Sequence, residues 1–321
     1  MSDLRSSLTP YIIGLIEQKR ACGYAYKYQE SVLTSFDSFC VTRGYEADKI
    51  NRDLVMDWAV QRPTEGKNHR NQRVSFVRQL SRYMLSLGKE AYIPRHYASQ
   101  TVTAPHILSM RELGEFYAAV DSYEPPQPSL RRLGPTYRVL FRLYYCCGLR
   151  LAEACRLQRS CLDLEEGAIR VLHSKGAKDR LVPVATDVLS LCVDYDTFMQ
   201  QIVPDREWFF PGNRPDSPFE KTSIDRKFRQ IWAMTPSAAS VDRRPTVQCL
   251  RHTFVVNRVN EWMQAGVGLD VLMPYLSRYL GHSSMAQTQY YYHLIAQAFP
   301  IVRRSDAIFP DLIPEVASYE E

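Results

Sequence analysis

The spacing of apolar residues predicts helices throughout the first hundred residues of the chain. Amphipathic stretches begin at residues 11–16 and 31–36, and a short helix is predicted over residues 52–60 with Asn51 as its N-cap. A longer helix is predicted over residues 68–87, where apolar side chains recur every three or four positions: Val74, Val77, Leu80, Met84 and Leu87. The pattern therefore indicates an N-terminal helical domain over residues 1–100.

The longest of these predicted helices carries a run of arginines. Arg70, Arg73, Arg78 and Arg82 fall largely outside its apolar stripe, so we expect a basic outer face. Such a face is suited to the phosphate backbone of DNA, although a charge cluster of this kind is also typical of an ordinary solvated helix. The formal net charge of +5 is compatible with a nucleic-acid partner without requiring one.

A linker is predicted between two domains. Residues 97–106 show no helical period and include Pro105, and we place the boundary between the domains at residues 101–106. A second domain is predicted over residues 107–300, where Ser109 is suited to cap a helix that runs to Val120. Residues 301–321 are expected to form a separate C-terminal tail.

The second domain is predicted to be helical with one β excursion. Residues 168–172 are rich in β-branched side chains and follow a turn at residues 165–167. A second turn at residues 174–179 leads to another strand at residues 180–184, and helices are predicted after Asp187 and from about Gln248 onward. The fold class is therefore mainly α with a small antiparallel β-sheet.

The composition is that of a globular protein. The 321 residues are 45% hydrophobic and 23% charged, enough for two domains with a sizeable core. The eight cysteines contain no CxxC pair, which favours reduced thiols over a disulfide framework or a zinc site, and no metal is expected. The N-terminus lacks the apolar core of a signal peptide and no apolar run has the length of a membrane span, so a cytoplasmic protein is expected.

Four short segments of the second domain carry candidate chemistry. They are Gly148-Leu149-Arg150 with Glu153, Lys175-Gly176 in the turn of the hairpin, Gln248-Cys249-Leu250-Arg251-His252, and Gly281-His282 followed by Tyr291. Taken in this order, the segments resemble the tyrosine recombinase family, which includes phage integrases, Xer-type recombinases and integrases of mobile elements. The resemblance extends over residues 107–299. The N-terminal region resembles the family's core-binding domain in size and helicity only.

The two arginines of these segments suit phosphoryl transfer. Attack on a phosphodiester requires that the non-bridging oxygens be neutralised as they gain negative charge, and the rigid fork of an arginine does this better than a lysine. Arg150 and Arg251 are the candidates. Arg150 could instead form an ion pair with Glu153, one helical turn away. Because the companion motifs are present, we expect the phosphate contact, with Glu153 orienting its neighbours.

The resemblance implies roles for two further residues. Lys175 would be the general acid that protonates the leaving 5′ oxygen, and Lys178 in the same turn is the alternative. His282 would donate a hydrogen bond to the scissile phosphate, the alternative being a histidine that caps the following helix.

Tyr291 is the predicted nucleophile. A phosphotyrosyl ester conserves the energy of the broken bond, so rejoining requires neither ATP nor metal and no cofactor is expected. Alignment on His282 and on the later His293 selects Tyr291 over Tyr290 and Tyr292, which are expected to be packing aromatics.

Gln248 departs from the family pattern, because most members carry a histidine at this position. An amide can donate a hydrogen bond to a phosphate oxygen but cannot take or give a proton. Gln248 and Arg251 are three residues apart and project from one helix face, whereas His252 points about a hundred degrees away and is expected to be a core or near-core histidine. Proton removal from Tyr291 then relies on other groups, or activity is reduced.

The resemblance implies an enzyme that acts on double-stranded recombination sites, as a dimer on one site and a tetramer across two. A mobile-element integrase or transposase and a housekeeping Xer-like resolvase share these motifs, and a DNA-binding accessory protein that has lost catalysis is a third hypothesis. Accessory DNA-bending or directionality proteins and nucleoid association are further implications. The tail over residues 301–321 is expected either to dock on a neighbouring subunit or to pack within its own chain.

Overall fold

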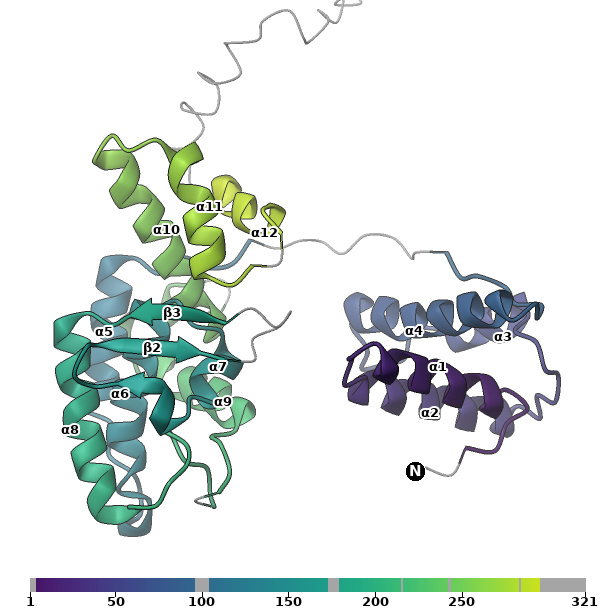
Figure 1. The fold of residues 1–321 in the computed structure, drawn as a ribbon, viewed down its shortest axis with the longest axis horizontal. Helices are drawn as coiled ribbons and strands as arrows, with labels where there is room; N and C mark the ends of the chain where they lie inside the picture. The colour runs from purple at the N-terminus through teal and green to yellow at the C-terminus, as the bar shows by residue number, and fades with distance from the viewer. Residues whose placement is uncertain are drawn as a thin grey trace, which may run out of the picture. The chain divides into compact units, whose positions relative to one another are not determined.

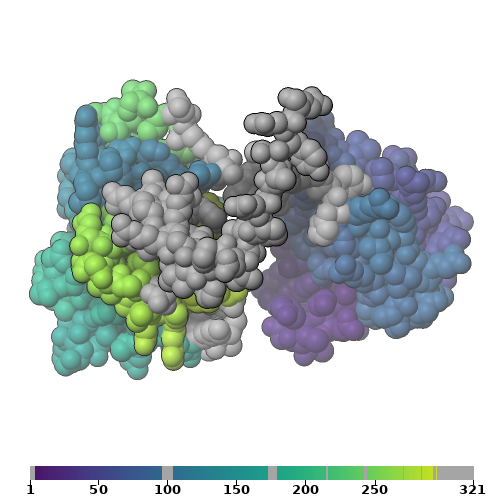
Figure 2. All heavy atoms as spheres, turned by 90° about the horizontal axis from the view of Figure 1, so that it is seen from above, coloured from purple at the N-terminus to yellow at the C-terminus, as the bar shows by residue number. Residues whose placement is uncertain are grey.

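The computed structural model describes residues 4–95, 104–172, 179–214, 216–241, 244–282 and 284–294. The chain divides into two compact units, Met1–Thr103 and Ala104–Glu321 (Figure 1). Figure 2 shows the atoms of both units as spheres, the first in purple to blue and the second in blue through teal to yellow. Both units are mainly helical, and a three-stranded antiparallel sheet lies in the second unit, which confirms the predicted fold class.

The N-terminal unit is built from the predicted helices. They are α1 (Thr9–Ala21), α2 (Lys27–Thr42), α3 (Arg52–Trp58) and α4 (Lys67–Ser86). The Asn51 side chain caps α3, since it accepts a hydrogen bond from the Leu54 amide at 2.8 Å. Val74, Val77, Leu80 and Met84 of α4 are buried in a core shared with α1, α2 and α3. Leu87, the last residue of the predicted stripe, follows the end of α4 and is exposed. The hydrophobic period therefore placed these helices correctly.

Arg73 is buried rather than on an outer face of α4. Its side chain is held by Glu65 through two hydrogen bonds of 2.6 and 2.8 Å, and its guanidinium carbon lies 4.7 Å from the centre of the Trp58 ring. The predicted place of Arg73 on a DNA-facing surface is therefore wrong. A long arginine stem can lie along an apolar core while its head group finds buried partners, and the hydrophobic period does not reveal this.

Arg78 departs from the prediction in the same way. It is buried, and it donates hydrogen bonds to the carbonyls of Pro94 and Arg95 at 2.7 and 2.9 Å. These contacts fix the chain that follows α4 and leave the guanidinium unsuited to a DNA phosphate. Of the other two arginines, Arg70 is half-buried and Arg82 is exposed.

The second unit contains eight α-helices in its described part. They are α5 (Met110–Asp121), α6 (Leu133–Cys146), α7 (Leu151–Cys155), α8 (Thr186–Ile202), α9 (Lys221–Trp232), α10 (Gln248–Gln264), α11 (Leu269–Tyr279) and α12 (Ala286–Gln289). Single turns of 3₁₀-helix lie at Pro128–Leu130, Arg159–Cys161, Pro236–Ala239 and Tyr290–Leu294. Helices α5, α6, α8 and α9 share one hydrophobic core with the sheet, and α10 packs on α6.

The sheet contains both predicted strands and one short addition. Its order is β1 (Leu162–Asp163), β2 (Ala168–Val171) and β3 (Arg180–Pro183), with each neighbouring pair antiparallel. Ile169 pairs with Val182, and both side chains are fully buried in the core with the helices. Helix α11 contacts β3, so the sheet also supports this helix (Figure 1).

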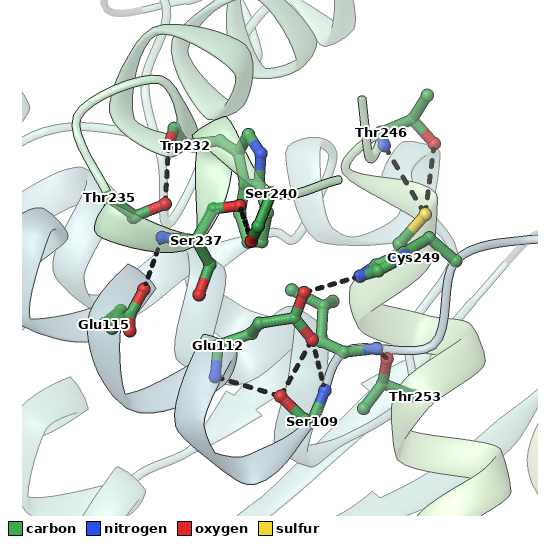
Figure 3. Close-up of polar contacts among 12 residues, drawn as sticks. Ser109, Glu112, Glu115, Trp232, Thr235, Ser237, Ser240, Thr246, Cys249 and Thr253 are labelled. Atoms are coloured by element: carbon green, nitrogen blue, oxygen red, sulfur yellow. Dashed lines mark hydrogen bonds and ion pairs between the residues drawn. The ribbon is translucent and has the colours of Figure 1, made fainter. Parts of the chain in front are cut away.

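The beginning of the second unit is tied to α10. Ser109 caps α5 through the predicted capping box with Glu112. The amide of Leu108 donates a hydrogen bond to the hydroxyl of Thr253 at 2.9 Å (Figure 3). Because Thr253 is two residues after Arg251 on α10, this contact helps to fix the helix that carries a predicted site residue.

All eight cysteines are free thiols, and most are buried. Burial raises the pKa of Cys40 and Cys192 to about 12, so these thiols behave as small apolar side chains. Within the ranges that the structure describes, no group of three or more His, Cys, Asp or Glu residues is placed to hold a metal ion. No helix in those ranges combines the length and the apolar character that crossing a bilayer requires.

Candidate active site

Side chains from separate segments of the second unit line one cavity of about 660 Å³. The segments are the turn before α7, the first turns of α10, the turn after α11, and the stretch from α12 into Tyr290–Leu294. Five of the predicted site residues border this cavity: Arg150, Gln248, Arg251, His282 and Tyr291. The fold thus brings together residues that are far apart in the sequence.

Arg150 is placed by a tight turn at the start of α7. Gly148 adopts a left-handed conformation with φ +54°, and a side chain at this position would also collide with Phe254. Arg150 donates a hydrogen bond to Glu153 at 2.7 Å and another to the carbonyl of Gly281. The ion pair considered from the sequence is therefore present, and the same arginine also lines the cavity.

Glu153 joins two arginines beneath the cavity. Besides Arg150, it accepts hydrogen bonds from the two terminal nitrogens of Arg180 at 2.7 and 3.1 Å. Burial alone would raise the pKa of Glu153, but the hydrogen bonds and charges of Arg180 and Arg150 outweigh burial and hold it below the ordinary value. This arrangement suits the orienting role predicted for Glu153.

Arg180 was not among the residues predicted from the sequence. It is the first residue of β3, and its pairing with Glu153 spans 27 positions. A carbon added at Gly281 would approach both Arg150 and Arg180 to 2.9 Å, so the three segments meet tightly here. The hairpin pattern located the strand, but local spacing carries no sign of a partner on a distant helix.

We expect Glu153→Gln to lower the free energy of unfolding by about 3 kcal/mol at neutral pH, because it leaves the buried Arg180 guanidinium, and the half-buried Arg150 beside it, without their carboxylate. The pKa of Glu153 is depressed in the folded protein, so this stabilisation is present above the ordinary Glu pKa and is lost as the pH falls through the folded value. The gap between variant and wild type in urea denaturation should therefore close under acid. The exposed Glu166→Gln is the control, and an equal loss there would refute a local effect.

Arg251 is almost fully buried, with 2% of its surface exposed. It donates hydrogen bonds to the carbonyl of Gly148 and, at 2.8 Å, to that of Leu280. Burial lowers the pKa of Arg251, yet a guanidinium remains protonated in any protein. Two carbonyls from distant segments thus hold the fork of donors in a fixed orientation at the cavity wall.

His282 follows Gly281, which takes φ +66° in the turn after α11. Its Nδ1 lies 2.7 Å from the hydroxyl of Thr288, and its Nε2 lies 3.4 Å from Arg251. Burial and the neighbouring arginine charges lower the pKa of His282 to about 4, so the ring is neutral at pH 7. The contact with Thr288 orients a neutral imidazole whose other nitrogen faces the arginine at the cavity.

Tyr291 is 3% exposed, and its hydroxyl lies 3.0 Å from Nδ1 of His252. Burial raises the pKa of Tyr291, and the charge of Arg251 offsets part of that effect. The predicted nucleophile is therefore a neutral phenol at pH 7, already in contact with an imidazole. Tyr290 is half-buried and packs edge-to-face on Tyr291, with 5.9 Å between ring centres.

His252 lies at the site, which corrects the expectation that it points away. It lines the same cavity as Arg251. His252 is one residue after Arg251 but four residues after Gln248, and residues four apart share a helix face. Burial and the charge of Arg251 lower the pKa of His252 to about 4. The four-residue spacing from Gln248 is the sequence feature that could have located it.

Gln248 is the first residue of α10 and is exposed at the cavity. Its side-chain oxygen accepts a hydrogen bond from the Tyr144 hydroxyl at 2.9 Å. The amide oxygen is thereby turned toward the protein, and the NH₂ group is the part able to donate to a ligand.

Two predictions lie outside the described residues. Lys175 and its alternative Lys178 belong to residues 173–178, and the tail belongs to residues 295–321.

The described part of the site carries more positive than negative charge. Arg150 and Arg180 both pair with Glu153, and the same carboxylate acts on Arg251 through its charge, so three guanidinium groups share this carboxylate and positive charge suited to a phosphate is left over.

The second unit matches the model of the phage integrase family over residues 110–298. A putative integrase/recombinase of Sinorhizobium fredii, y4rE, is 28% identical over 287 residues, covering 86% of this chain and 88% of that protein. Tyrosine recombinase XerD of Pseudomonas aeruginosa is 26% identical over 272 residues, covering 82% and 84%.

A solved structure shares the fold. It is the XerH site-specific recombinase bound to a palindromic difH substrate in a post-cleavage complex. The TM-score is 0.61 at 17% sequence identity, and the match covers 88% of this chain and 78% of that chain. At this identity the likeness concerns the fold and not the individual site residues.

Proposed function

The chain belongs to the phage integrase family and is a tyrosine recombinase, an enzyme that breaks and rejoins DNA strands, and we propose that Tyr291 is its nucleophile. The phenol oxygen attacks the scissile phosphorus, the bond from phosphorus to the 5′ oxygen breaks, and the 3′ phosphate stays esterified to Tyr291. The observation that carries this proposal is the cavity that Tyr291 shares with Arg150, Arg251 and His282.

The basic side chains have complementary roles in this step. Arg150 and Arg251 bind the non-bridging oxygens as these gain negative charge, and His282 donates a hydrogen bond to the same phosphate. The phenol loses its proton as the new bond forms, and Lys175 supplies the proton that the leaving 5′ oxygen takes up. Rejoining reverses these transfers, so the reaction consumes neither ATP nor a metal-bound nucleophile.

We assign the activity to integration, excision or transposition of a mobile element. The similarity to the putative integrase/recombinase y4rE along most of both chains supports this role. A resolvase of the Xer type is the second candidate, supported by the similarity to XerD. Attachment sites and cargo genes beside the coding gene would favour the first, and a lone chromosomal target site the second.

Double-stranded DNA and further copies of this chain are the partners that this function requires. Strand exchange between two sites needs four cleavages, and we infer a dimer on each site and a tetramer in the synaptic complex. For residues 301–321 we propose docking on a neighbouring subunit, with packing within the same chain as the alternative; a truncation at Arg304 that still forms tetramers would reject the docking.

Covalent trapping on DNA tests the proposed function. A binding site is selected from a randomised duplex pool with the wild-type protein, and a nick is then placed beside the cleavage position so that the released fragment diffuses away. We expect a covalent adduct whose DNA maps to Tyr291 by mass spectrometry of the proteolysed complex. A protein that binds the selected site without any adduct would be the catalytically inactive accessory factor instead.

We propose that α4 contacts DNA through Arg82, which is exposed on this helix. We expect Arg82→Gln to weaken binding to the selected site at all salt concentrations and to reduce the slope of log Kd against log salt by about one. The reason is that one phosphate neutralisation, and the counterion release that accompanies it, is lost. The control is Arg43→Gln. Arg43 is an exposed arginine at the end of α2 that pairs with Asp57 of α3, and its replacement should leave the slope unchanged. An unaltered slope in Arg82→Gln would place the DNA elsewhere.

A further inference from the structure

The proposed reaction needs an acceptor for the phenolic proton, and Gln248 cannot serve. An amide neither takes nor gives a proton, and the Gln248 oxygen already accepts a hydrogen bond from Tyr144. Because the pKa of Tyr291 is raised by burial, few molecules carry a tyrosinate at neutral pH. A base close to the hydroxyl would therefore have a large effect on the rate.

His282 is near Tyr291, but no hydrogen bond joins it to the Tyr291 hydroxyl among the contacts of the described residues. The two rings are nearly parallel, with an angle of 4° between their planes and 6.4 Å between their centres. One ring nitrogen of His282 is taken by Thr288 at 2.7 Å, and the other faces Arg251 at 3.4 Å. This geometry suits a hydrogen bond to the phosphate and does not suit removal of the phenolic proton.

His252 has the geometry that the reaction requires. Its Nδ1 lies 3.0 Å from the Tyr291 oxygen, and the rings are tilted by 46° with centres 5.6 Å apart. Arg251 also hydrogen-bonds the Tyr291 side chain, but its guanidinium stays protonated, so of these two contacts His252 is the one that can accept a proton. Its position on the first turns of α10, one turn after Gln248, places it where the helix faces the cavity.

On the basis of the proposed function, we propose that His252 is the general base of strand cleavage, in place of the proton-transfer group that Gln248 lacks. The Nδ1 lone pair accepts the phenolic proton while the bond from the Tyr291 oxygen to phosphorus forms and the bond to the 5′ oxygen breaks. On rejoining, the imidazolium returns the proton to the departing phenol oxygen. His252 touches the reacting oxygen and is thus a catalytic residue.

The charges around His252 favour this role. Arg251 on its own helix and the neighbouring His282 and Tyr291 face it, and burial with the Arg251 charge keeps the ring neutral in the absence of DNA. A neutral ring has a lone pair to offer. A phosphate bound by Arg150 and Arg251 brings negative charge that offsets the arginines and raises the pKa of His252, so the base becomes stronger when the substrate is in place.

The test compares wild type with His252→Asn on the nicked selected site. Asparagine keeps a polar atom near the position of Nδ1 but cannot take up a proton. We expect single-turnover cleavage to slow by about 10²- to 10³-fold at pH 7, with DNA affinity and circular dichroism unchanged. The wild-type rate should be flat with pH above the pKa of His252, whereas the variant's rate should rise tenfold per pH unit until Tyr291 ionises.

A substrate with sulfur at the bridging 5′ position separates base from acid. Sulfur leaves without protonation, so it should restore cleavage by Lys175→Ala but not by His252→Asn. Parallel pH profiles for wild type and His252→Asn, rescue of His252→Asn by sulfur, or a loss below threefold would each overturn the assignment. Absence of an adduct with the wild-type protein would instead reject the proposed function, and this inference with it.

Discussion

Replacing Tyr291 by phenylalanine is expected to abolish the covalent protein–DNA adduct. The loss should be at least about 10⁴-fold in single-turnover cleavage, because no neighbouring group can carry the DNA once the attacking oxygen is gone. Phenylalanine keeps the ring that packs at 3% exposure and removes only the hydroxyl that contacts His252. Stability should therefore fall by about 1 kcal/mol at most, and affinity for the selected site should stay within threefold of wild type.

Tyr290→Phe and Tyr292→Phe are the matched controls, since they make the same chemical change at the adjacent positions. Tyr290 lines the cavity and packs on Tyr291, so a modest effect on the rate is compatible with the assignment. If either control removed the adduct while Tyr291→Phe kept it, the nucleophile would be the neighbouring tyrosine. Adduct formation is read on denaturing gels and binding by titration on uncleaved duplex, which separates chemistry from recognition.

Local patterns of the sequence were sufficient for much of the fold. The caps at Asn51 and Ser109 require only a side chain and the amides of the next turn, so they are visible in a few consecutive residues. The strands around Ile169 and Val182 are predicted by their β-branched residues and by the turns that flank them. The meeting of Arg150, Arg251 and Tyr291 at one cavity followed from the family resemblance, because spacing alone does not bring distant segments together.

What the sequence did not reveal depends on long-range burial. Whether an arginine of α4 faces solvent or a buried acceptor is decided by other segments, as with Arg73 and Glu65 or Arg78 and the chain after α4. Arg180 and Glu153 are likewise joined only when β3 is laid beside α7. The four-residue spacing between Gln248 and His252 does place both on the face of α10 that lines the cavity. The one-residue step from Arg251 to His252, considered alone, led to the wrong prediction that His252 points away from the site.

The site is held together by its own arginines before any DNA binds. Arg150 donates to the carbonyl of Gly281, and Arg251 donates to those of Gly148 and Leu280. The left-handed turns at Gly148 and Gly281 present these carbonyls to the guanidinium groups. Donors fixed in advance cost little reorganisation when the phosphate arrives, and the same contacts couple catalysis to the stability of the second unit.

Arg251→Ala should consequently affect both properties at once. We expect cleavage on the nicked selected site to fall by about 10³-fold or more, because removal of one preorganised donor to a transition-state oxyanion costs about 10²–10³ and two donors are lost here. The free energy of unfolding should fall by about 3 kcal/mol, since two buried carbonyls lose their partner. Single-turnover kinetics and urea denaturation measure the two effects separately.

If the alanine variant is too unstable to assay, Arg251→Lys can show whether catalysis needs the paired donors of the guanidinium or only its positive charge. Lysine keeps the positive charge and can reach one carbonyl, so stability and DNA affinity should largely persist, but it cannot present two parallel donors to a phosphate. Cleavage should therefore still be about 10²-fold slower than in wild type. Arg258→Ala, an exposed arginine on the same helix paired with Glu261, should change the rate less than about twofold and stability by no more than about 0.5 kcal/mol. If Arg251→Lys cleaved at the wild-type rate, the geometry of the guanidinium would be irrelevant to catalysis, and Arg251 would act only as a charge that supports the turns around it.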